Sequence, residues 1–285
     1  MPMTFLILGI TYMLTAQVAN SPESGDSLRN AVIFYASFDE TVKADIAGGQ
    51  ATLDTRSNHP TEPGRFVFDK GFDEQVFRIA KDKGISGGAL EVVDVLPSNG
   101  RVYFPARGNL PFDPKGWSGA LSVWCKTDPN KLLKTTFCDP IQITERGANN
   151  GGLWFDFNNA TPRDMRHGAF PAIPTGEKPI AEDDPKAPIV QVHKIDWKAD
   201  DWHHVVLTWS SFDTGKNDAV SQIFIDGKLI GEIRDCPIAM KWDLEKAGIY
   251  VAINYIGLLD ELAIFRRSLS AKEVARLYRE PAFLK

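Results

Sequence analysis

The last third of the chain carries the clearest alternation of apolar and polar residues. In the segment WHHVVLTW, Val205, Leu207 and Trp209 are separated by single residues that point the other way. This period of two predicts a β-strand with one face on a hydrophobic core. The segment GLLDELAIF at 257–265 and the tail RRSLSAKEVARLY at 266–278 follow it.

A β-hairpin is predicted between these segments. The dipeptide DG at 226–227 lies between two apolar runs and supplies the positive φ values of a two-residue type I′ turn. We therefore expect Phe224 to face Leu229, and Ile223 to face Ile230. Both faces of the hairpin are apolar, which favours an inner strand pair of a two-sheet sandwich.

The rest of the chain contains more strand patterns and no long helical period after its first residues. Strands are predicted at 31–40, on both sides of a turn at 97–100, and at 119–126, 140–145 and 152–158. Residues 51–75 are polar and rich in turn formers, and 160–188 contain little but proline, glycine and charge, which indicates a loop or a broken strand. A single all-β sandwich with long loops is the simplest interpretation.

Net charge argues against two classes of partner. The 285 residues carry a formal charge of −5 and contain no block of Lys or Arg. Nucleic acids and anionic membranes select basic patches, so neither is expected as a partner.

The N-terminus has the pattern of an export signal. Residues 1–19 are mostly apolar, end in small residues at Ala16 and Ala19, and are followed by a polar segment. A membrane anchor is the alternative because no Lys or Arg precedes the apolar run, but this run is shorter than the roughly 20 residues of a spanning helix. We expect a signal peptide at 1–19, a linker at 20–30, and a secreted or periplasmic domain at 31–285 without a membrane span.

The chain has three cysteines, Cys125, Cys138 and Cys236. An odd number does not suggest a disulfide framework in a domain of this size. Cys125 and Cys138 could meet as a cross-strand pair, and three buried thiols that act as small hydrophobic groups are the alternative.

Four motifs of the C-terminal third follow one another in a characteristic order. They are WHHV at 202–205, FIDGK at 224–228, LDELAIF at 259–265 and RSLS at 267–270, followed by Glu273, Leu277 and Tyr278. This set resembles the laminin-G-like branch of the concanavalin A-like lectin/glucanase jelly rolls. The resemblance implies two antiparallel sheets with a short C-terminal helical segment, and it covers the rest of the chain only loosely.

The resemblance also implies a structural calcium ion. The first and last long strands are neighbours in this fold, and relatives often bind calcium where they meet. Asp39 and Asp260 lie at the matching points of these strands. Calcium accepts six to eight oxygen ligands in loose geometry, so we expect Ca²⁺ at this pair. The alternative is that both carboxylates are solvated or accept hydrogen bonds from backbone amides.

No glucanase motif is visible in the sequence. Retaining glucanases of this fold place two acids on one strand as E-x-D-x-E, because their carboxyl groups must lie about 5 Å apart. No Glu of this chain fits that pattern. The triplet Gln191-Val192-His193 resembles one motif of the alginate-lyase branch, and a neutral histidine suits proton transfer, but the partner strands of that branch are missing.

A glycan site is predicted on the strand GLWFDFN at 152–158. Trp154, Asp156 and Asn158 share one face, while the apolar residues between them suit the core better. Sugars stack on aromatic rings and bind planar polar groups. Residues that could join this face are Gln191, His193, His204 and the loop residues Arg163, Arg166 and His167. In the alternative, Trp154 is a covered aromatic and the histidines are satisfied surface groups.

These patterns favour an exported, non-catalytic module that binds a polysaccharide, a glycoprotein glycan or a protein. A polysaccharide lyase or glycoside hydrolase on the same scaffold is one alternative. A structural component of an envelope or matrix is the other, because the fold alone does not decide the function.

Overall fold

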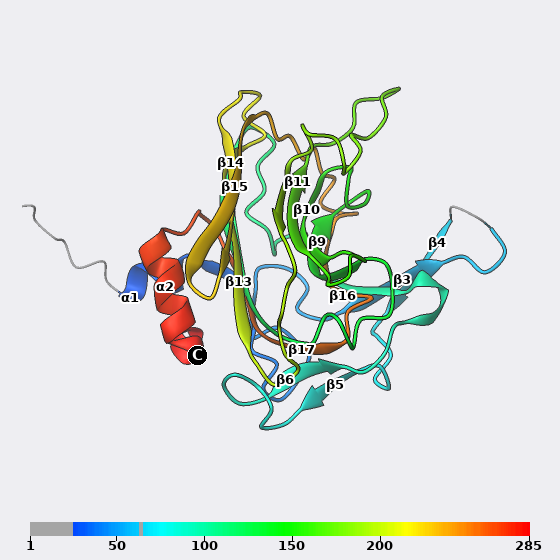
Figure 1. The fold of residues 1–285 in the computed structure, drawn as a ribbon, viewed down its shortest axis with the longest axis vertical. Helices are drawn as coiled ribbons and strands as arrows, with labels where there is room; N and C mark the ends of the chain where they lie inside the picture. The colour runs from blue at the N-terminus through cyan, green and yellow to red at the C-terminus, as the bar shows by residue number, and fades with distance from the viewer. Residues whose placement is uncertain (1–24, 63–64) are drawn as a thin grey trace, which may run out of the picture.

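The computed structural model describes residues 25–62 and 65–285 as two antiparallel β-sheets packed face to face (Figure 1). This architecture confirms the all-β jelly roll expected from the alternation of apolar residues. The predicted signal peptide at 1–19 and the first residues of the linker lie outside the described residues.

Within the described residues, the first sheet has nine strands. They are β1 (Val32–Ala36), β2 (Ile46–Ala47), β5 (Phe77–Ala80), β6 (Ala89–Val92), β8 (Trp117–Lys126), β13 (His203–Phe212), β14 (Ala219–Ile225), β15 (Lys228–Cys236) and β17 (Gly257–Phe265). The main order is β15-β14-β13-β8-β17-β1-β2, and β6 extends from β17 with β5 beside it. The first and last long strands are neighbours as expected, since Tyr35 of β1 lies opposite Ala263 of β17.

The second sheet has eight strands in the described part of the chain. They are β3 (Asp54–Asn58), β4 (Phe66–Lys70), β7 (Arg101–Pro105), β9 (Cys138–Thr144), β10 (Gly152–Phe157), β11 (Met165–Phe170), β12 (Ile189–Val192) and β16 (Gly248–Ile253). Their order is β12-β11-β10-β9-β16-β7-β3-β4. The β3–β4 hairpin therefore forms one end of this sheet and projects from the body of the molecule (Figure 1).

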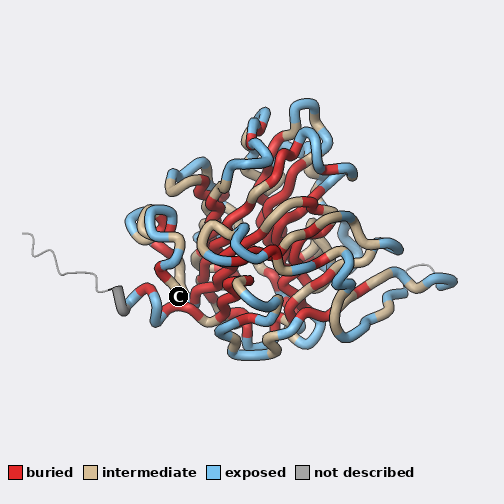
Figure 2. The backbone as a smooth tube through the Cα atoms, turned by 90° about the horizontal axis from the view of Figure 1, so that it is seen from below, coloured by how far each residue is buried: buried red, intermediate tan, exposed pale blue. Residues whose placement is uncertain are grey.

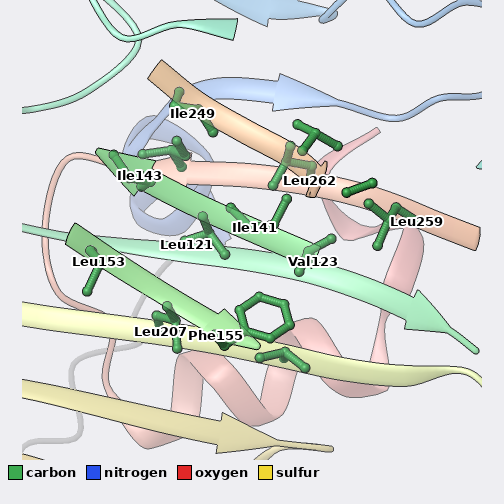
Figure 3. Close-up of a cluster of buried hydrophobic side chains, with 14 of the residues drawn as sticks. Leu121, Val123, Ile141, Ile143, Leu153, Phe155, Leu207, Ile249, Leu259 and Leu262 are labelled. Atoms are coloured by element: carbon green, nitrogen blue, oxygen red, sulfur yellow. The ribbon is translucent and has the colours of Figure 1, made fainter. Parts of the chain in front are cut away.

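The main hydrophobic core lies between the two sheets. Figure 3 shows Ile141 and Ile143 of β9 and Leu153 and Phe155 of β10 close to the inward side chains of β8, β13 and β17. Burial follows the strands and gives way to exposed residues in the loops and in the β3–β4 hairpin (Figure 2). Because side chains alternate along a strand, the residues between these core positions lie on the outer faces of the sheets.

Helix α2 (Ala271–Arg279) covers the outer face of the nine-stranded sheet (Figure 1). Ser270 and Glu273 form a capping box at its start, and Val274 and Leu277 are buried. These side chains pack with Val206 of β13 in a second hydrophobic cluster, which also includes Leu28 of α1 (Gly25–Asn30) and Phe283 of the 3₁₀ turn η2 (Pro281–Leu284). The helix confirms the expected C-terminal helical segment, and we call the surface beneath it the covered face.

The predicted DG turn is present, but the hairpin differs from the expected one. Both residues of the turn have positive φ, 50° at Asp226 and 76° at Gly227, as a type I′ turn requires. Phe224 faces Leu229 as predicted, whereas a bulge places Ile223 opposite Gly231 instead of Ile230. The prediction of an inner strand pair was wrong for β15, which forms a sheet edge with Leu229 and Ile230 exposed.

Two polar stretches contain strands that the pattern missed. Residues 51–75 include β3 and β4, and 160–188 include β11, whose six residues are all buried inside the second sheet. The short 3₁₀ turn η1 (Pro97–Asn99) lies at the predicted turn before β7. All three cysteines are free thiols, and only Cys236 is partly exposed. In the described part of the chain, no helix has the length and apolar character needed to cross a membrane.

Candidate functional site

The outer face of the eight-stranded sheet carries a row of polar and aromatic side chains. Leu153, Phe155 and Phe157 of β10 face the core, so Trp154 and Asp156 face outward, as the sequence predicted. The same alternation turns Gln142 of β9 and Arg166 of β11 to this face, because their strand neighbours Ile141, Ile143, Met165 and Ala169 belong to the core.

Trp154, Asp156 and Gln142 form part of the floor of a pocket of about 550 Å³, which we call the cleft. Arg166 lies beside it, in contact with Asp156 and Phe137. Arg101 of β7 and Asp139 and Gln142 of β9 lie beside Trp154 and Asp156 on its floor. Arg56 of β3 lies on the floor opposite Arg101. The sides come from three other segments: strand β4 with Phe66, the residues before β9 with Phe137, and the loop after β11 with Glu182. A volume of this size is typical of small-molecule sites.

Trp154 is part of the floor and not an exposed platform. Only 1% of its surface is accessible, its Nε1 donates a hydrogen bond to the Ala148 carbonyl at 2.9 Å, and its ring stacks on Phe170. The residue opposite in β11 is Gly168, where a Cβ atom would lie 2.3 Å from the indole. Glycine at this position therefore allows the ring to lie flat against the sheet.

The exposed aromatic rings of the cleft are two phenylalanines that the sequence analysis did not select. Phe66 and Phe137 are each 41% exposed and line the cleft. Each ring also lies under a guanidinium group, that of Arg56 at 4.4 Å and that of Arg166 at 5.0 Å from the ring centre. The signal in the sequence was the alternation of FVF at 66–68 in a polar segment, which indicates an exposed strand.

Arg166 holds two carboxylates at one side of the cleft. Its guanidinium donates to both oxygens of Asp156, at 2.9 and 2.5 Å, and to Oε2 of Glu182 at 2.5 Å. Burial raises the pKa of Asp156 to about 6. Arg166 acts in the opposite direction by stabilising the ionised carboxylate, and the charge of Glu182 offsets part of this effect. Burial also favours protonation of Glu182, but hydrogen bonds from Asn149 and Arg166 outweigh it and lower the pKa of Glu182.

Asp139 is a second buried carboxyl group in the cleft. Its side chain forms no hydrogen bond or ion pair with any described residue. Burial raises the pKa of Asp139 well above its usual value, and the charge of Asp156 raises it further, while Arg101 and Arg166 act in the opposite direction. The cleft thus contains two carboxyl groups that are biased toward the protonated form.

Four other predicted residues gather around Asp164, outside the cleft. Gln191 Nε2 donates to Asp164 Oδ2 at 2.7 Å, and His193 Nδ1 lies 3.3 Å from the same oxygen. Asn158 accepts the Asp164 backbone amide, and Arg163 donates to three backbone carbonyls. The structure therefore places Asn158, Arg163, Gln191 and His193 together around Asp164. None of them lines the cleft, although Gln191 lies opposite Arg166 in the pairing of β11 and β12.

The two central histidines do not reach the cleft, which corrects the prediction that they share a face with Trp154. His204 lies on the covered face, where its Nε2 is 2.8 Å from the Ser122 hydroxyl and its ring stacks on Trp124. His167 points between the sheets to the Ser221 hydroxyl. Burial lowers the pKa of His204 to about 3 and that of His167 to about 4, so both rings are neutral in the folded protein.

Asp39 and Asp260 lie where β1 and β17 meet the loop before β6, but they face different partners. Asp260 accepts hydrogen bonds from the amides of Ile85 and Ser86, and Asp39 accepts that of Gly88. The Lys285 ammonium lies 2.9 Å from Asp39 and also contacts Glu261 and both oxygens of Ser86.

The oxygen atoms at this junction are of the kind that calcium binds, and Lys285 supplies the positive charge among them. Among residues 25–62 and 65–285, no group of three or more His, Cys, Asp or Glu side chains is arranged to hold a metal ion. The observed hydrogen bonds agree with the alternative in which the two carboxylates accept backbone amides. Calcium binding stays a prediction.

A family model described as the concanavalin A-like lectin/glucanases superfamily matches residues 97–275. No curated protein matches the chain. Among solved structures, the receptor binding domain of botulinum neurotoxin C/D mosaic serotype is similar with a TM-score of 0.53 and 12% identity, over 88% of this chain and 51% of that one.

Domain 4 of AbnA, a GH43 extracellular arabinanase from Geobacillus stearothermophilus in complex with arabinotriose, has a TM-score of 0.47 and 16% identity, over 87% of this chain and 98% of that one. At these identities, the likeness to solved structures extends to the fold alone. The chain spans about half the length of the toxin domain.

Proposed function

Because the chain belongs to the concanavalin A-like lectin/glucanase superfamily, we propose that its cleft binds a glycan. The observation that carries this proposal is a polar and charged floor between two exposed phenyl rings, those of Phe66 and Phe137. Sugar rings present C–H groups to aromatic faces and hydroxyl groups to planar hydrogen-bonding side chains. The cleft offers both kinds of partner within one pocket.

Two features of the floor support this proposal. Gln142 is buried, and its Nε2 lacks a hydrogen-bond partner among the described residues. Arg101 Nε is in the same situation. Buried donors without partners are rare in folded proteins, and a ligand with several hydroxyl groups would satisfy them after a small rotation of these side chains toward the cleft.

We propose that the domain is exported and acts in this way outside the cell or in the periplasm. The support is the apolar segment at 1–19 with small residues at its end. Mass spectrometry of the protein secreted by an expressing cell would give the new N-terminus. We expect it close to residue 20, and retention of residues 1–19 on a membrane fraction would contradict the proposal.

A glycan array followed by calorimetry tests the binding proposal. We expect Phe66→Ala to weaken binding by about 1–3 kcal/mol if the ring stacks on a sugar, by analogy with aromatic anchors at other interfaces. Phe68→Ala is the matched control, because Phe68 is an exposed ring of the same strand that does not line the cleft. Equal affinities for wild type and Phe66→Ala, with Phe137→Ala also unchanged, would exclude the cleft as the binding site.

A second candidate function is enzymatic cleavage of a glycan in the same cleft. It is favoured by Asp139 and Asp156, two buried carboxyl groups on neighbouring strands with raised pKa values. Such groups suit proton transfer near neutral pH. New reducing ends or unsaturated products that disappear in Asp139→Asn would establish an enzyme, and their absence across the polysaccharides that bind would favour the non-catalytic module.

We further propose that calcium can bind at Asp39 and Asp260 when Lys285 leaves its position. A bound ion would stabilise the fold by mass action, by about 2.7 kcal/mol at a hundredfold excess over its Kd. We expect millimolar calcium to raise the melting temperature of Lys285→Ala above that in EDTA, with a smaller rise in wild type and none in Asp260→Asn. Equal melting temperatures of Lys285→Ala in calcium and in EDTA would rule out the site.

A further inference from the structure

Arg56 and Arg101 form a pair of arginines across two strands on the floor of the cleft. They are register partners in the antiparallel pairing of β3 and β7, and both line the cleft. Only 9% of the surface of Arg56 is exposed. Its guanidinium lies over the ring of Phe66 at 4.4 Å and over that of Tyr250 at 5.0 Å from the ring centres.

Neither arginine has a carboxylate partner in the described part of the chain. No ion pair or hydrogen bond of either side chain is formed there, and Arg101 Nε is buried without an acceptor. Arg166 beside the cleft differs, because it forms ion pairs with both Asp156 and Glu182. Like charges opposite each other in a sheet destabilise it, so the pair adds unfavourable energy to the free protein.

The electrostatics agree with this geometry. Burial lowers the pKa of Arg101, and the neighbouring charge of Arg56 lowers it further. The Asp139 carboxyl group acts on the pKa of Arg101 in the opposite direction, but it is biased toward its protonated form and forms no ion pair with either guanidinium. Asp54 of β3 pairs with Lys70 at 2.6 Å. The positive charge of the two arginines is therefore balanced by no ion pair within the described protein.

We propose that the glycan of the cleft is acidic and that a carboxylate or sulfate group binds between Arg56 and Arg101. This proposal rests on the proposed glycan-binding function of the cleft. Guanidinium groups bind planar or tetrahedral oxyanions in a bidentate manner, and such charge-assisted hydrogen bonds are stronger than neutral ones. The stacking of Arg56 on Phe66 and Tyr250 fixes the plane of its guanidinium before a ligand arrives.

Gln142 adds a neutral donor on the same floor. Its Nε2 has no hydrogen-bond partner among the described residues, and it lines the cleft with the two arginines. A sugar that bears an acidic group and adjacent hydroxyl groups would satisfy these donors together. The predicted ligand class is thus a polyuronate or a sulfated polysaccharide, and its neutral counterparts should bind more weakly.

Calorimetry with matched saccharides tests this inference. The probes are oligogalacturonate and its fully methyl-esterified form, which share one backbone and differ in charge. Sulfated galactan oligosaccharides and their desulfated forms test the second source of the anion. We expect one acidic form to bind at least about tenfold more tightly than its neutral counterpart, equal to about 1.4 kcal/mol. The preferred pair identifies the acidic group as carboxylate or sulfate.

Variants of the two arginines complete the experiment. Arg101→Gln and Arg56→Gln should each remove the preference for the acidic form, and Arg101→Lys should restore it only in part because an ammonium lacks the planar fork. Arg78→Gln is the control, since Arg78 pairs with Glu91 on the other sheet and lies outside the cleft. Circular dichroism shows whether each variant folds. If Arg101→Gln does not fold, the preference of Arg56→Gln for the acidic form decides the outcome.

The outcomes separate this inference from the proposed function. If acidic and neutral forms bind equally, or if both Gln variants keep the preference, the acidic ligand is wrong while the glycan site stands. If none of these saccharides, acidic or neutral, binds to the folded protein, the inference of an acidic ligand fails, and the glycan array decides separately on the proposed function.

Discussion

The two outer faces of the sandwich carry similar side chains but differ in what lies above them. On the covered face, Tyr278 of α2 stacks on Trp124 and His204 of the sheet, and the ring centres of Trp124 and His204 are 4.8 Å apart. On the opposite face, Trp154 and its polar neighbours form the floor of an open cleft of about 550 Å³. One face has become a second core, and the other holds donors and acids without partners.

This difference shows that a row of aromatic and polar residues on a strand does not by itself indicate a binding face. His204 and Trp154 occupy equivalent outward positions on strands of their sheets. Because α2 covers His204, this side chain is a neutral, hydrogen-bonded group inside the protein. The absence of such a cover within the described residues leaves the second face available to ligands.

The largest expected effect concerns the covered face. Trp124→Ala should lower the free energy of unfolding by about 3–5 kcal/mol, because a large buried ring leaves a cavity beneath the helix. Urea denaturation measures this loss. Trp202→Ala is the control, since Trp202 is only half-buried beside Lys126. A similar small loss in both variants would mean that α2 does not form a core with the sheet.

The pH dependence of stability tests whether His204 is sealed from water. Burial lowers the pKa of His204 from its usual 6.5 to about 3. Below pH 6.5, the unfolded chain binds a proton at His204 that the folded chain does not bind. The free energy of unfolding is therefore undiminished above pH 6.5 and decreases as the pH falls from 6.5 toward 3. Between pH 7 and pH 5 the loss is about 2 kcal/mol for one histidine.

The matched variant for this prediction replaces both hydrogen-bond partners. His204→Phe combined with Ser122→Ala keeps the aromatic stack and removes the titrating group. The difference in unfolding free energy between this variant and wild type should change between pH 7 and pH 5 by the same amount. A difference that is constant with pH would show that His204 has the same pKa in the folded and unfolded chain and is therefore not sealed from water.

A smaller effect is expected at the turn that packs against the helix. Gly227→Val should destabilise the protein by about 1–2 kcal/mol, because a β-branched residue tolerates positive φ poorly. A Cβ atom there would also lie 3.2 Å from the Tyr278 ring. Gly215→Val separates the two causes, since Gly215 has a φ of 74° and no atom within 4 Å of such a Cβ. Equal melting temperatures of wild type and Gly227→Val would disprove the turn.

The smallest expected effect lies in the cleft and has the opposite sign. Gln142→Leu should raise the free energy of unfolding by about 1 kcal/mol, because it removes a buried donor without a partner. Gln222→Leu is the surface control, because the Gln222 side chain already donates a hydrogen bond to Glu232. Destabilisation by Gln142→Leu would show that this side chain is already satisfied in the free protein and is not reserved for a ligand.

The fold was predictable because its signals are local. The alternation around Val205, the turn at 226–227 and the motif at 259–265 each specify an element within about ten residues. The strand β11 was missed because proline, glycine and charge surround it. Its six residues MRHGAF do not show the apolar alternation of an ordinary strand.

The cleft was only partly predictable because it depends on pairing between distant segments. Trp154, Asp156 and Arg166 were selected from one stretch of sequence, and the structure keeps them in contact, with Trp154 and Asp156 lining the cleft. Arg56 and Arg101 become neighbours only when β3 pairs with β7, and the sequence around Arg56 shows no strand pattern. Gln191 and His193 resemble part of a catalytic motif in the sequence, but in the structure their side chains contact Asp164, which directly precedes β11.

The distribution of the cleft along the chain has a consequence for folding. Its residues come from positions 56 to 254 and from strands on both sides of β16, so no short segment of the chain contains the site. Sheets built from such distant contacts form late and slowly compared with helices and local hairpins. Binding competence should therefore appear only with the final, concerted step of refolding, and a ligand should slow hydrogen exchange across the whole eight-stranded sheet.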